Sequence, residues 1–141
     1  MIIDAIRNGI VIDHIPASLS MKLYRILGLD DLSCSVAVLK NVASSKLGRK
    51  DIIKIDEIID LNWDVLGYIA PDITVNIIRD GALAEKRHPQ LPTQLTNVIF
   101  CENPRCITTT EQELPHIFKL TDPEQRIYRC IYCEARAKKH E

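Results

Sequence analysis

The chain has 141 residues, of which 46% are hydrophobic, so it can form one ordinary domain or two small ones. Its 18 basic and 19 acidic side chains give a net charge of −1, which argues against a protein that binds polyanions through a basic surplus. No apolar run approaches the roughly 20 residues of a membrane span, and the N-terminus lacks the basic start of a signal peptide. We therefore expect a cytoplasmic protein.

Four segments in the first 80 residues have the composition of β-strands. They are rich in β-branched and apolar residues and end at proline, glycine or polar positions. These segments are residues 10–15, 35–42, 51–55 and 73–79. Asp80-Gly81 directly after the last of them is typical of a tight turn.

Two segments between these strands have apolar residues at helical spacing. They predict helices over residues 19–27 and 57–70, with Ser18 and Gly28 as the caps of the first helix. The order β-α-β-β-α-β is typical of a ferredoxin-like fold, in which two helices cover one face of a sheet. The fold class is therefore α+β, and the other face of the sheet is left for a ligand, a second chain or solvent.

A polar segment with two prolines, residues 86–94, is typical of a linker. Beyond it, residues 97–101, 117–120 and 127–131 favour short strands. We therefore predict two domains, residues 1–94 and residues 95–141. The second is too small for its apolar core alone to stabilise it, so something else must hold it together.

Four of the five cysteines lie in the second predicted domain, in two close pairs. Cys101 and Cys106 form the first pair, and Cys130 and Cys133 form the second. Each pair offers two sulfurs, and two such pairs complete a tetrahedron of thiolates around one zinc ion. Four protein ligands leave no position for a catalytic water, so this spacing predicts one structural Zn²⁺ per chain.

Other interpretations of the cysteines remain. The four could be unrelated buried residues, or Cys130 and Cys133 could be a redox-active pair, although such a pair is expected at a strand–helix junction. Cys34 is far from the others in sequence and is expected to be a small buried hydrophobic residue. With four sulfurs present, His116 and His140 are expected to be surface residues.

Charged and polar residues gather around the strands of the first predicted domain. Because the first and third strands of such a sheet are central neighbours, Asp13 and Lys54 can approach each other. A carboxylate beside ammonium groups can accept from ribose hydroxyls while the cations neutralise phosphates, which is the chemistry of a nucleotide site. The alternative is that these are ordinary solvated charges at strand ends. The residues concerned are Asp13, His14, Arg49, Lys50, Lys54, Asn76, Lys86, Arg87 and His88.

Motifs for catalysis are missing from the sequence. Residues 47–50 contain a single glycine and are too short for a phosphate-binding loop. No nucleophile and base, and no pair of carboxylates in an obvious cleft, can be proposed. A binding or regulatory role therefore fits better than an enzyme.

Four motifs occur in one order along the chain. They are Val-Ile-Asp-His-Ile-Pro at 11–16, Gly-Arg-Lys-Asp-Ile-Ile-Lys-Ile at 48–55, Ala-Pro with Thr-Val-Asn at 70–76, and the four cysteines. Together they closely resemble the regulatory chain of aspartate carbamoyltransferase, over almost the whole chain. The resemblance implies a non-catalytic subunit with a ferredoxin-like allosteric domain and a zinc domain that docks on the catalytic chain.

The same resemblance implies a role for each site residue. Asp13 and Lys54 would contact the ribose, and His14 and Lys86 the triphosphate of CTP, ATP or UTP. Groups around Ala5, Ile6 and Leu83 would contact the base. Lys50 and Asn76 would border the pocket and its metal-assisted extension. The zinc ligands would be Cys101, Cys106, Cys130 and Cys133.

The implied partners follow from the same family. Regulatory homodimers would bridge two catalytic trimers and transmit allosteric control in de novo pyrimidine biosynthesis. A different class of protein, a zinc-ribbon nucleic-acid-binding protein, is the alternative. Near-neutral charge and an aromatic content of 5% count against it, because single-strand binders need basic grooves and stacking side chains.

Overall fold

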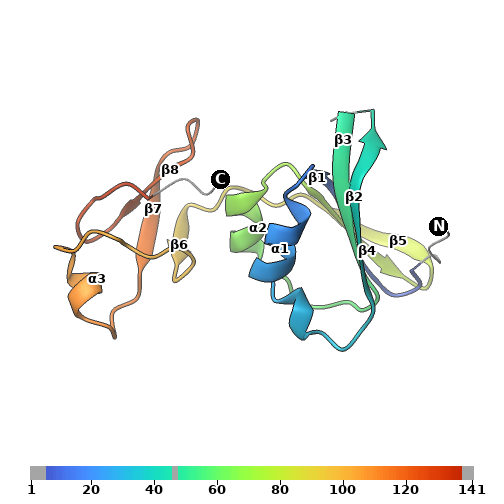
Figure 1. Cartoon of the computed structure of the whole chain (residues 1–141), viewed down its shortest axis with the longest axis horizontal. Helices are drawn as coiled ribbons and strands as arrows, with labels where there is room; N and C mark the ends of the chain where they lie inside the picture. Colours follow the sequence, from blue (N-terminus) through green and yellow to red (C-terminus); the bar gives the residue numbers. More distant parts are fainter. Residues whose placement is uncertain (1–5, 46–47, 138–141) are drawn as a thin grey trace. The chain divides into compact units, whose positions relative to one another are not determined.

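The chain folds into two compact units, shown in Figure 1. The computed structural model describes residues 6–45 and 48–137, and the units are Met1–Gln90 and Leu91–Glu141. Both combine antiparallel strands with short helices, which confirms the predicted α+β class. No helix among the described residues has the length and apolar composition needed to cross a membrane.

The first unit is built on a five-stranded antiparallel sheet with the strand order β2-β3-β1-β4-β5. As predicted, the first and third strands are neighbours in the middle of the sheet. The first four strands have the ferredoxin-like order, and β5 extends the sheet beyond β4. The strands are β1 (Gly9–Pro16), β2 (Val36–Ser44), β3 (Gly48–Ile55), β4 (Thr74–Arg79) and β5 (Ala82–Arg87).

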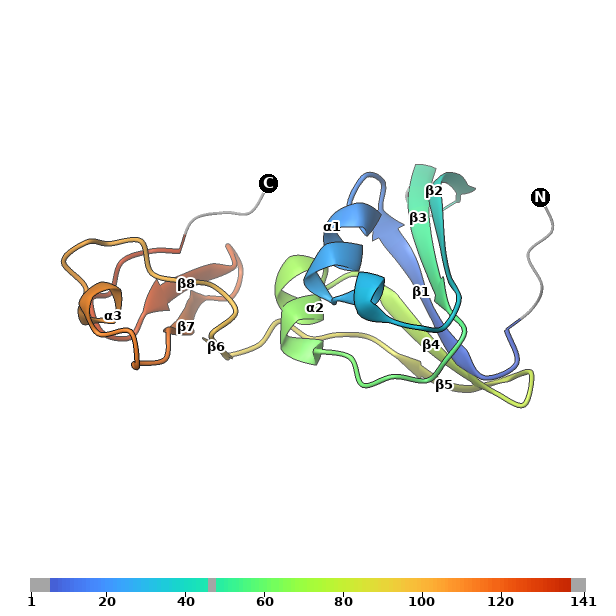
Figure 2. The same ribbon diagram turned by 60° about the horizontal axis from the view of Figure 1, so that its bottom comes forward.

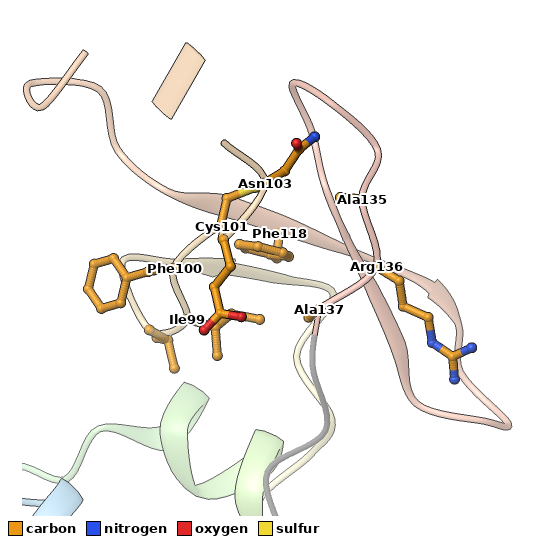
Figure 3. A pocket seen from close by; sticks show the side chains of 10 residues that line it. Ile99, Phe100, Cys101, Asn103, Phe118, Ala135, Arg136 and Ala137 are labelled. Atoms are coloured by element: carbon orange, nitrogen blue, oxygen red, sulfur yellow. The ribbon is translucent and has the colours of Figure 1, made fainter. Parts of the chain in front are cut away.

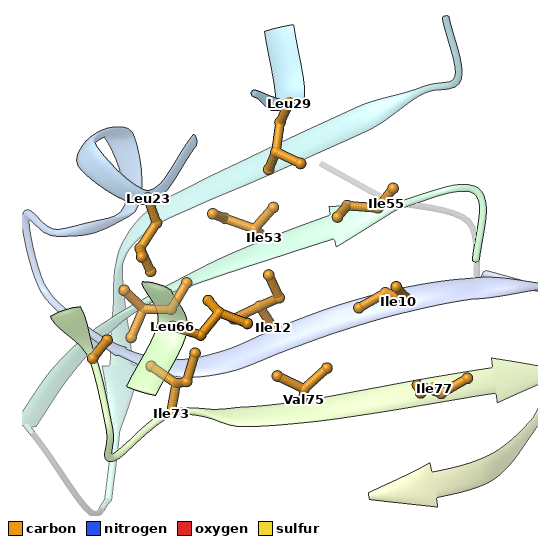
Figure 4. Packing of buried hydrophobic residues seen from close by; sticks show 12 residues of the cluster. Ile10, Ile12, Leu23, Leu29, Ile53, Ile55, Leu66, Ile73, Val75 and Ile77 are labelled. Atoms are coloured by element: carbon orange, nitrogen blue, oxygen red, sulfur yellow. The ribbon is translucent and has the colours of Figure 1, made fainter. Parts of the chain in front are cut away.

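Two helices, α1 (Ser20–Ile26) and α2 (Trp63–Ile69), cover one face of this sheet, and a 3-10 turn η1 (Leu29–Asp31) follows α1 (Figures 1 and 2). Alternate side chains of the central strands point toward the helices and form the core, as Figure 4 shows. Among residues 6–45 and 48–137, no helix covers the opposite face, which is called the open face below.

Two elements of the first unit differ from the sequence prediction. The predicted helix over 57–70 begins only at Trp63, because the Asn62 side chain accepts a hydrogen bond from the Val65 backbone N–H and caps the helix there. The predicted linker over 86–94 is too long at both ends. Lys86 and Arg87 belong to β5, and Gln94 belongs to β6.

The N-terminus of α1 is held by a carboxylate from another strand. Leu19 occupies the cap position without a side-chain bond, so the prediction of Ser18 as the N-cap is wrong. Instead, one oxygen of the fully buried Asp51 accepts from the backbone N–H groups of Ser18 and Ser20 and from the Ser20 hydroxyl. The other oxygen accepts from the backbone N–H of Asn41 in β2. Asp51 thereby ties together β2, β3 and the β1–α1 connection.

We expect Asp51→Asn to destabilise the first unit by about 2 to 3 kcal/mol at pH 7, because the amide cannot accept all four bonds. Burial alone would raise the pKa of Asp51, but the hydrogen bonds from Ser20, Asn41 and Ser18 lower it on balance. A lowered pKa means that this stabilisation is present above pH 4 and is lost as the pH falls through the folded-state value. The difference between the two proteins should therefore shrink toward pH 3.

The measurement is urea denaturation followed by tryptophan fluorescence, because the chain has one tryptophan, Trp63 in α2. Asp60→Asn is the matched control, since Asp60 is exposed. It should change the free energy of unfolding by less than about 0.5 kcal/mol. An Asp51→Asn protein as stable as the control variant at pH 7 would contradict the assigned role.

The second unit is a three-stranded antiparallel sheet with one short helix. Its strands are β6 (Gln94–Thr96), β7 (Ile117–Asp122) and β8 (Ile127–Cys130), and the helix is α3 (Ile107–Thr110). The prediction of a strand over 97–101 is wrong. The strand comes earlier, and Asn97 has a left-handed backbone with φ of 57° that ends it. Leu95, Ile99, Phe118 and Tyr128 are the large buried side chains beside the cysteines.

Candidate functional site

The four cysteines of the second unit converge on one point. Their Sγ atoms all lie within 4.8 Å of one another, with 3.6 Å between Cys101 and Cys133 and 3.7 Å between Cys106 and Cys130. These separations are far longer than a disulfide bond. Four sulfurs around one ion with metal–sulfur bonds of about 2.3 Å stand about 3.8 Å apart, so the donor set fits a tetrahedral metal. Three of the four side chains are buried.

The pKa values of the clustered cysteines also indicate that the cluster binds a cation. Burial raises the pKa of the Cys101 thiol to about 12 and raises the pKa of Cys130 as well. Burial opposes ionisation of Cys106 too, but hydrogen bonding to Thr108, whose Oγ1 lies 3.0 Å from the sulfur, lowers the pKa of Cys106 to about 7. One thiolate can form unaided, whereas four thiolates in so small a volume require a bound metal ion to offset their repulsion.

Groups around the cluster fix its shape. His116, expected to be a surface residue, is half-buried, and its Nδ1 accepts a hydrogen bond of 3.0 Å from the Cys101 backbone N–H. Its ring also meets Phe100 edge to face with centroids 5.0 Å apart. Beside them is a hollow of about 480 Å³, shown in Figure 3, which is lined by residues including Ile99, Phe118 and Arg136. His140 lies outside the described residues.

In the first unit, the end of β1 contains a bulge at two predicted site residues. The pairing with β3 shifts between Ile12 and Ile15, so Asp13 and His14 both stand opposite one β3 position. His14 has a φ of 59°, a conformation that non-glycine residues rarely adopt and that costs on the order of 1 to 3 kcal/mol. Bulges of this kind redirect side chains and are frequent beside functional sites.

The bulge holds a compact polar cluster. Asp13 Oδ1 accepts from the His14 backbone N–H at 2.6 Å and from Lys50 Nζ at 2.9 Å, and His14 Nδ1 lies 3.2 Å from Thr74 Oγ1. Burial would raise the pKa of Asp13, but the bond from Lys50 and that from the His14 backbone lower it on balance. Asp13 is therefore an ionised acceptor. Its ion pair is with Lys50 and not with Lys54, the expected neighbour, because Lys54 stands opposite Val11.

Two of the other predicted cations, Lys54 and Lys86, line up with Asn76 across the open face. Lys54 of β3 stands opposite Val11 of β1, Val11 opposite Asn76 of β4, and Asn76 opposite Lys86 of β5. Residues directly opposite each other project from the same face of a sheet. We call these four residues the cross-strand row. Three strand spacings separate Lys54 from Lys86, which is about 14 Å.

Of the residues predicted near the base, Leu83 lies in the edge strand β5, and Ile6 precedes β1. Leu83 stands opposite Ile78 and is 58% exposed, and Ile6 is half-buried three residues before the start of β1. Ala5 lies outside the described residues. Thr74 was missed in the sequence, although it is buried against His14. The period of two along β4 was the signal that could have placed it on the same face as Asn76.

Comparisons with known proteins agree with this architecture. Residues 1–90 match the family described as "Aspartate carbamoyltransferase regulatory chain, allosteric domain", and residues 93–141 match "Aspartate carbamoyltransferase regulatory chain, metal binding domain". Among individual proteins, the chain is similar to three proteins named "Aspartate carbamoyltransferase regulatory chain". That of Clostridium tetani is 49% identical over 133 residues, covering 94% of this chain and 92% of the relative. That of Clostridium botulinum (strain Okra) is 48% identical, covering 94% and 90%. That of Bifidobacterium longum is 43% identical over 138 residues, covering 98% and 99%.

An allosteric domain followed by a four-cysteine metal-binding domain defines a regulatory and non-catalytic chain. The chain belongs to the aspartate carbamoyltransferase regulatory chain family.

Proposed function

We propose that the first unit binds nucleoside triphosphates on its open face and thereby controls a catalytic aspartate carbamoyltransferase chain in de novo pyrimidine biosynthesis. The effectors are CTP, ATP and UTP. The observation that carries the proposal is the open face itself, where an ionised carboxylate at a strained bulge lies beside a row that begins and ends with lysine. Anionic and hydroxyl-rich ligands are what such a surface recognises.

The proposed roles follow the geometry of the bulge and the row. Both contacts that Asp13 makes within the described part of the chain fall on Oδ1, which leaves Oδ2 for a ribose hydroxyl. Lys50 keeps that carboxylate ionised and oriented, so it borders the site rather than binding the ligand directly. Lys54 acts with Asp13 at the ribose, and Asn76 borders the site from the middle of the row.

The phosphates belong to the other end of the row. His14, whose ring lies against Thr74 of β4, and Lys86 would contact the triphosphate, and about 14 Å between the strands of Lys54 and Lys86 allows the two ammonium groups to serve different parts of one ligand. Ala5, Ile6 and Leu83 would contact the base. The direct test of this part is calorimetric titration of the whole chain with CTP, ATP and the nucleoside cytidine. The triphosphates should bind much more tightly than cytidine, and an equal affinity would contradict a site for phosphates.

We propose that the metal of the second unit is zinc, one structural ion per chain. Four thiolates with no open position suit Zn²⁺, which is redox-inert and tolerates a tetrahedral thiolate site. A tetrahedral thiolate site also fits iron, which would colour the protein. Elemental analysis of the purified chain should give one zinc per chain and no iron, and a coloured iron-containing protein would overturn the assignment.

We propose that the second unit docks on the catalytic chain. Four apolar residues next to the metal ligands in sequence are at least 40% exposed: Phe100, Ile107, Ile131 and Tyr132. Because α3 and the turn after β8 also carry the metal ligands or adjoin them, the metal fixes the shape of this surface. A nucleic-acid-binding role has no comparable support.

We also propose that the first units pair as a homodimer through β2, so that a regulatory dimer can bridge two catalytic trimers. β2 is an edge strand, and its half-buried run from Val36 to Leu39 is apolar. Analytical ultracentrifugation of the metal-loaded chain at tens of micromolar should give a dimer. A monomer at that concentration would contradict the pairing.

A further inference from the structure

β5 depends on few contacts, although it carries the proposed phosphate ligand Lys86. All six of its residues are exposed, and β4 is its only partner among the strands that the structure describes, at the edge of the sheet. The β4–β5 register is also interrupted between Ile77 and Ile78. A short edge strand with no side chain in the core frays easily, so the position of Lys86 needs an additional anchor.

Such an anchor exists one residue further along the strand. The guanidinium carbon of Arg87 lies 3.9 Å from the centroid of the Trp63 ring, the first residue of α2. Arg87 Nε also lies 3.6 Å from Glu85 Oε1, two positions back on the same side of β5. Trp63 itself packs against the core of the first unit. This stacking of Arg87 on Trp63 therefore connects the end of β5 to α2.

Successive side chains of β5 point to opposite faces of the sheet, so the proposed phosphate ligand and the anchoring residue lie on different faces. Glu85 stands opposite Ile77, which belongs to the core face, whereas Lys86 stands opposite Asn76 on the open face. Arg87 points back to the helical side, where it meets Trp63. When Arg87 is held on the ring, Lys86 is therefore turned toward the open face and the proposed phosphates.

We propose that the Arg87–Trp63 stack is a positioning device that holds Lys86 in place for the phosphates of the nucleotide. The inference rests on the proposed function and adds two residues to that site, neither of which touches the ligand. It makes the stack a determinant of how strongly the chain discriminates a triphosphate from a nucleoside.

The test is a double-mutant cycle on the whole metal-loaded chain, with CTP and cytidine titrated by calorimetry. Arg87→Ala should weaken CTP binding by about fivefold or more, as expected for a cation–aromatic contact, and should leave cytidine binding unchanged. In a Lys86→Ala background the same substitution should have no further effect on CTP. Arg87→Lys and Trp63→Phe keep a cation over a ring and should retain most of the CTP affinity.

The outcomes separate this proposal from the function on which it rests. If the unmodified chain fails to prefer CTP over cytidine, the proposed function fails, and the positioning role fails with it. Two results would overturn only the positioning role in a chain that prefers CTP. In the first, Arg87→Ala weakens the binding of CTP and of cytidine by the same factor. In the second, Arg87→Ala weakens CTP binding as much in the Lys86→Ala background as in the unmodified chain. The fluorescence of Trp63 reports the stack directly and should change in Arg87→Ala without nucleotide.

Discussion

Removing the metal is expected to unfold the second unit while the first stays folded. The second unit has few large buried apolar side chains besides the cysteines, so its own core supplies little stability. Structural zinc in small domains contributes about 10 to 16 kcal/mol of apparent binding free energy, which is comparable to or larger than the whole stability of an ordinary domain, about 5 to 15 kcal/mol. Cys101→Ser and Cys133→Ser should act in the same direction, because three thiolates form an incomplete site.

Hydrogen exchange followed by mass spectrometry measures the protection of backbone amides in each unit separately. After treatment with a mercurial and a chelator, amides in β6, β7 and β8 should lose their protection, whereas those in β1, β3 and β4 should keep it. Trp63 fluorescence provides an independent record of the first unit. Cys34→Ser is the matched control, since Cys34 lies outside the metal cluster and should leave the metal content unchanged. Protected strands in the metal-free second unit would show that the metal does not hold this unit together.

Lys86→Ala is expected to weaken CTP or ATP binding by tenfold or more without unfolding the chain. A hydrogen bond to a charged group contributes about 1.5 to 3 kcal/mol, and about 1.4 kcal/mol corresponds to a factor of ten in affinity. Lys86 is exposed at the end of the cross-strand row and takes no part in the core, so its removal should leave the stability of the first unit unchanged.

Calorimetry with CTP and with cytidine separates the phosphate contact from the rest of the site. The affinity for cytidine should not change in Lys86→Ala, because the nucleoside has no phosphate. Lys119→Ala is the matched control, an exposed lysine of β7 in the second unit, and should bind CTP like the unmodified chain. If CTP affinity is the same in all three proteins, Lys86 is not a phosphate ligand.

The sequence predicted the elements whose side chains alternate clearly between core and solvent. The four strands and two helices of the ferredoxin-like order were identified because their buried apolar residues recur with the period of each element. β5 was missed for the opposite reason. Its sequence Ala-Leu-Ala-Glu-Lys-Arg is exposed on both sides, and backbone pairing with β4 rather than burial makes it a strand.

The metal centre can be predicted from the spacing of the four cysteines in the sequence, whereas the contacts on the open face cannot. Paired cysteines at short intervals define a ligand set whatever the intervening fold. The Asp13–Lys50 ion pair depends on a one-residue bulge, and no local pattern in the sequence marks that bulge. The Trp63–Arg87 stack joins residues 24 positions apart, and it could be recognised only once β5 was known to be a strand.

Nucleotide binding on the first unit is proposed to control a catalytic chain docked on the second. The most direct measurement is the velocity of a catalytic trimer against aspartate concentration, with and without this chain, CTP and ATP. We expect the nucleotides to change the velocity only when the metal-loaded chain is bound, and Lys86→Ala to reduce that response while still binding the trimer. A complex that binds CTP but whose velocity curve is the same with and without CTP would show that nucleotide binding does not control the catalytic chain.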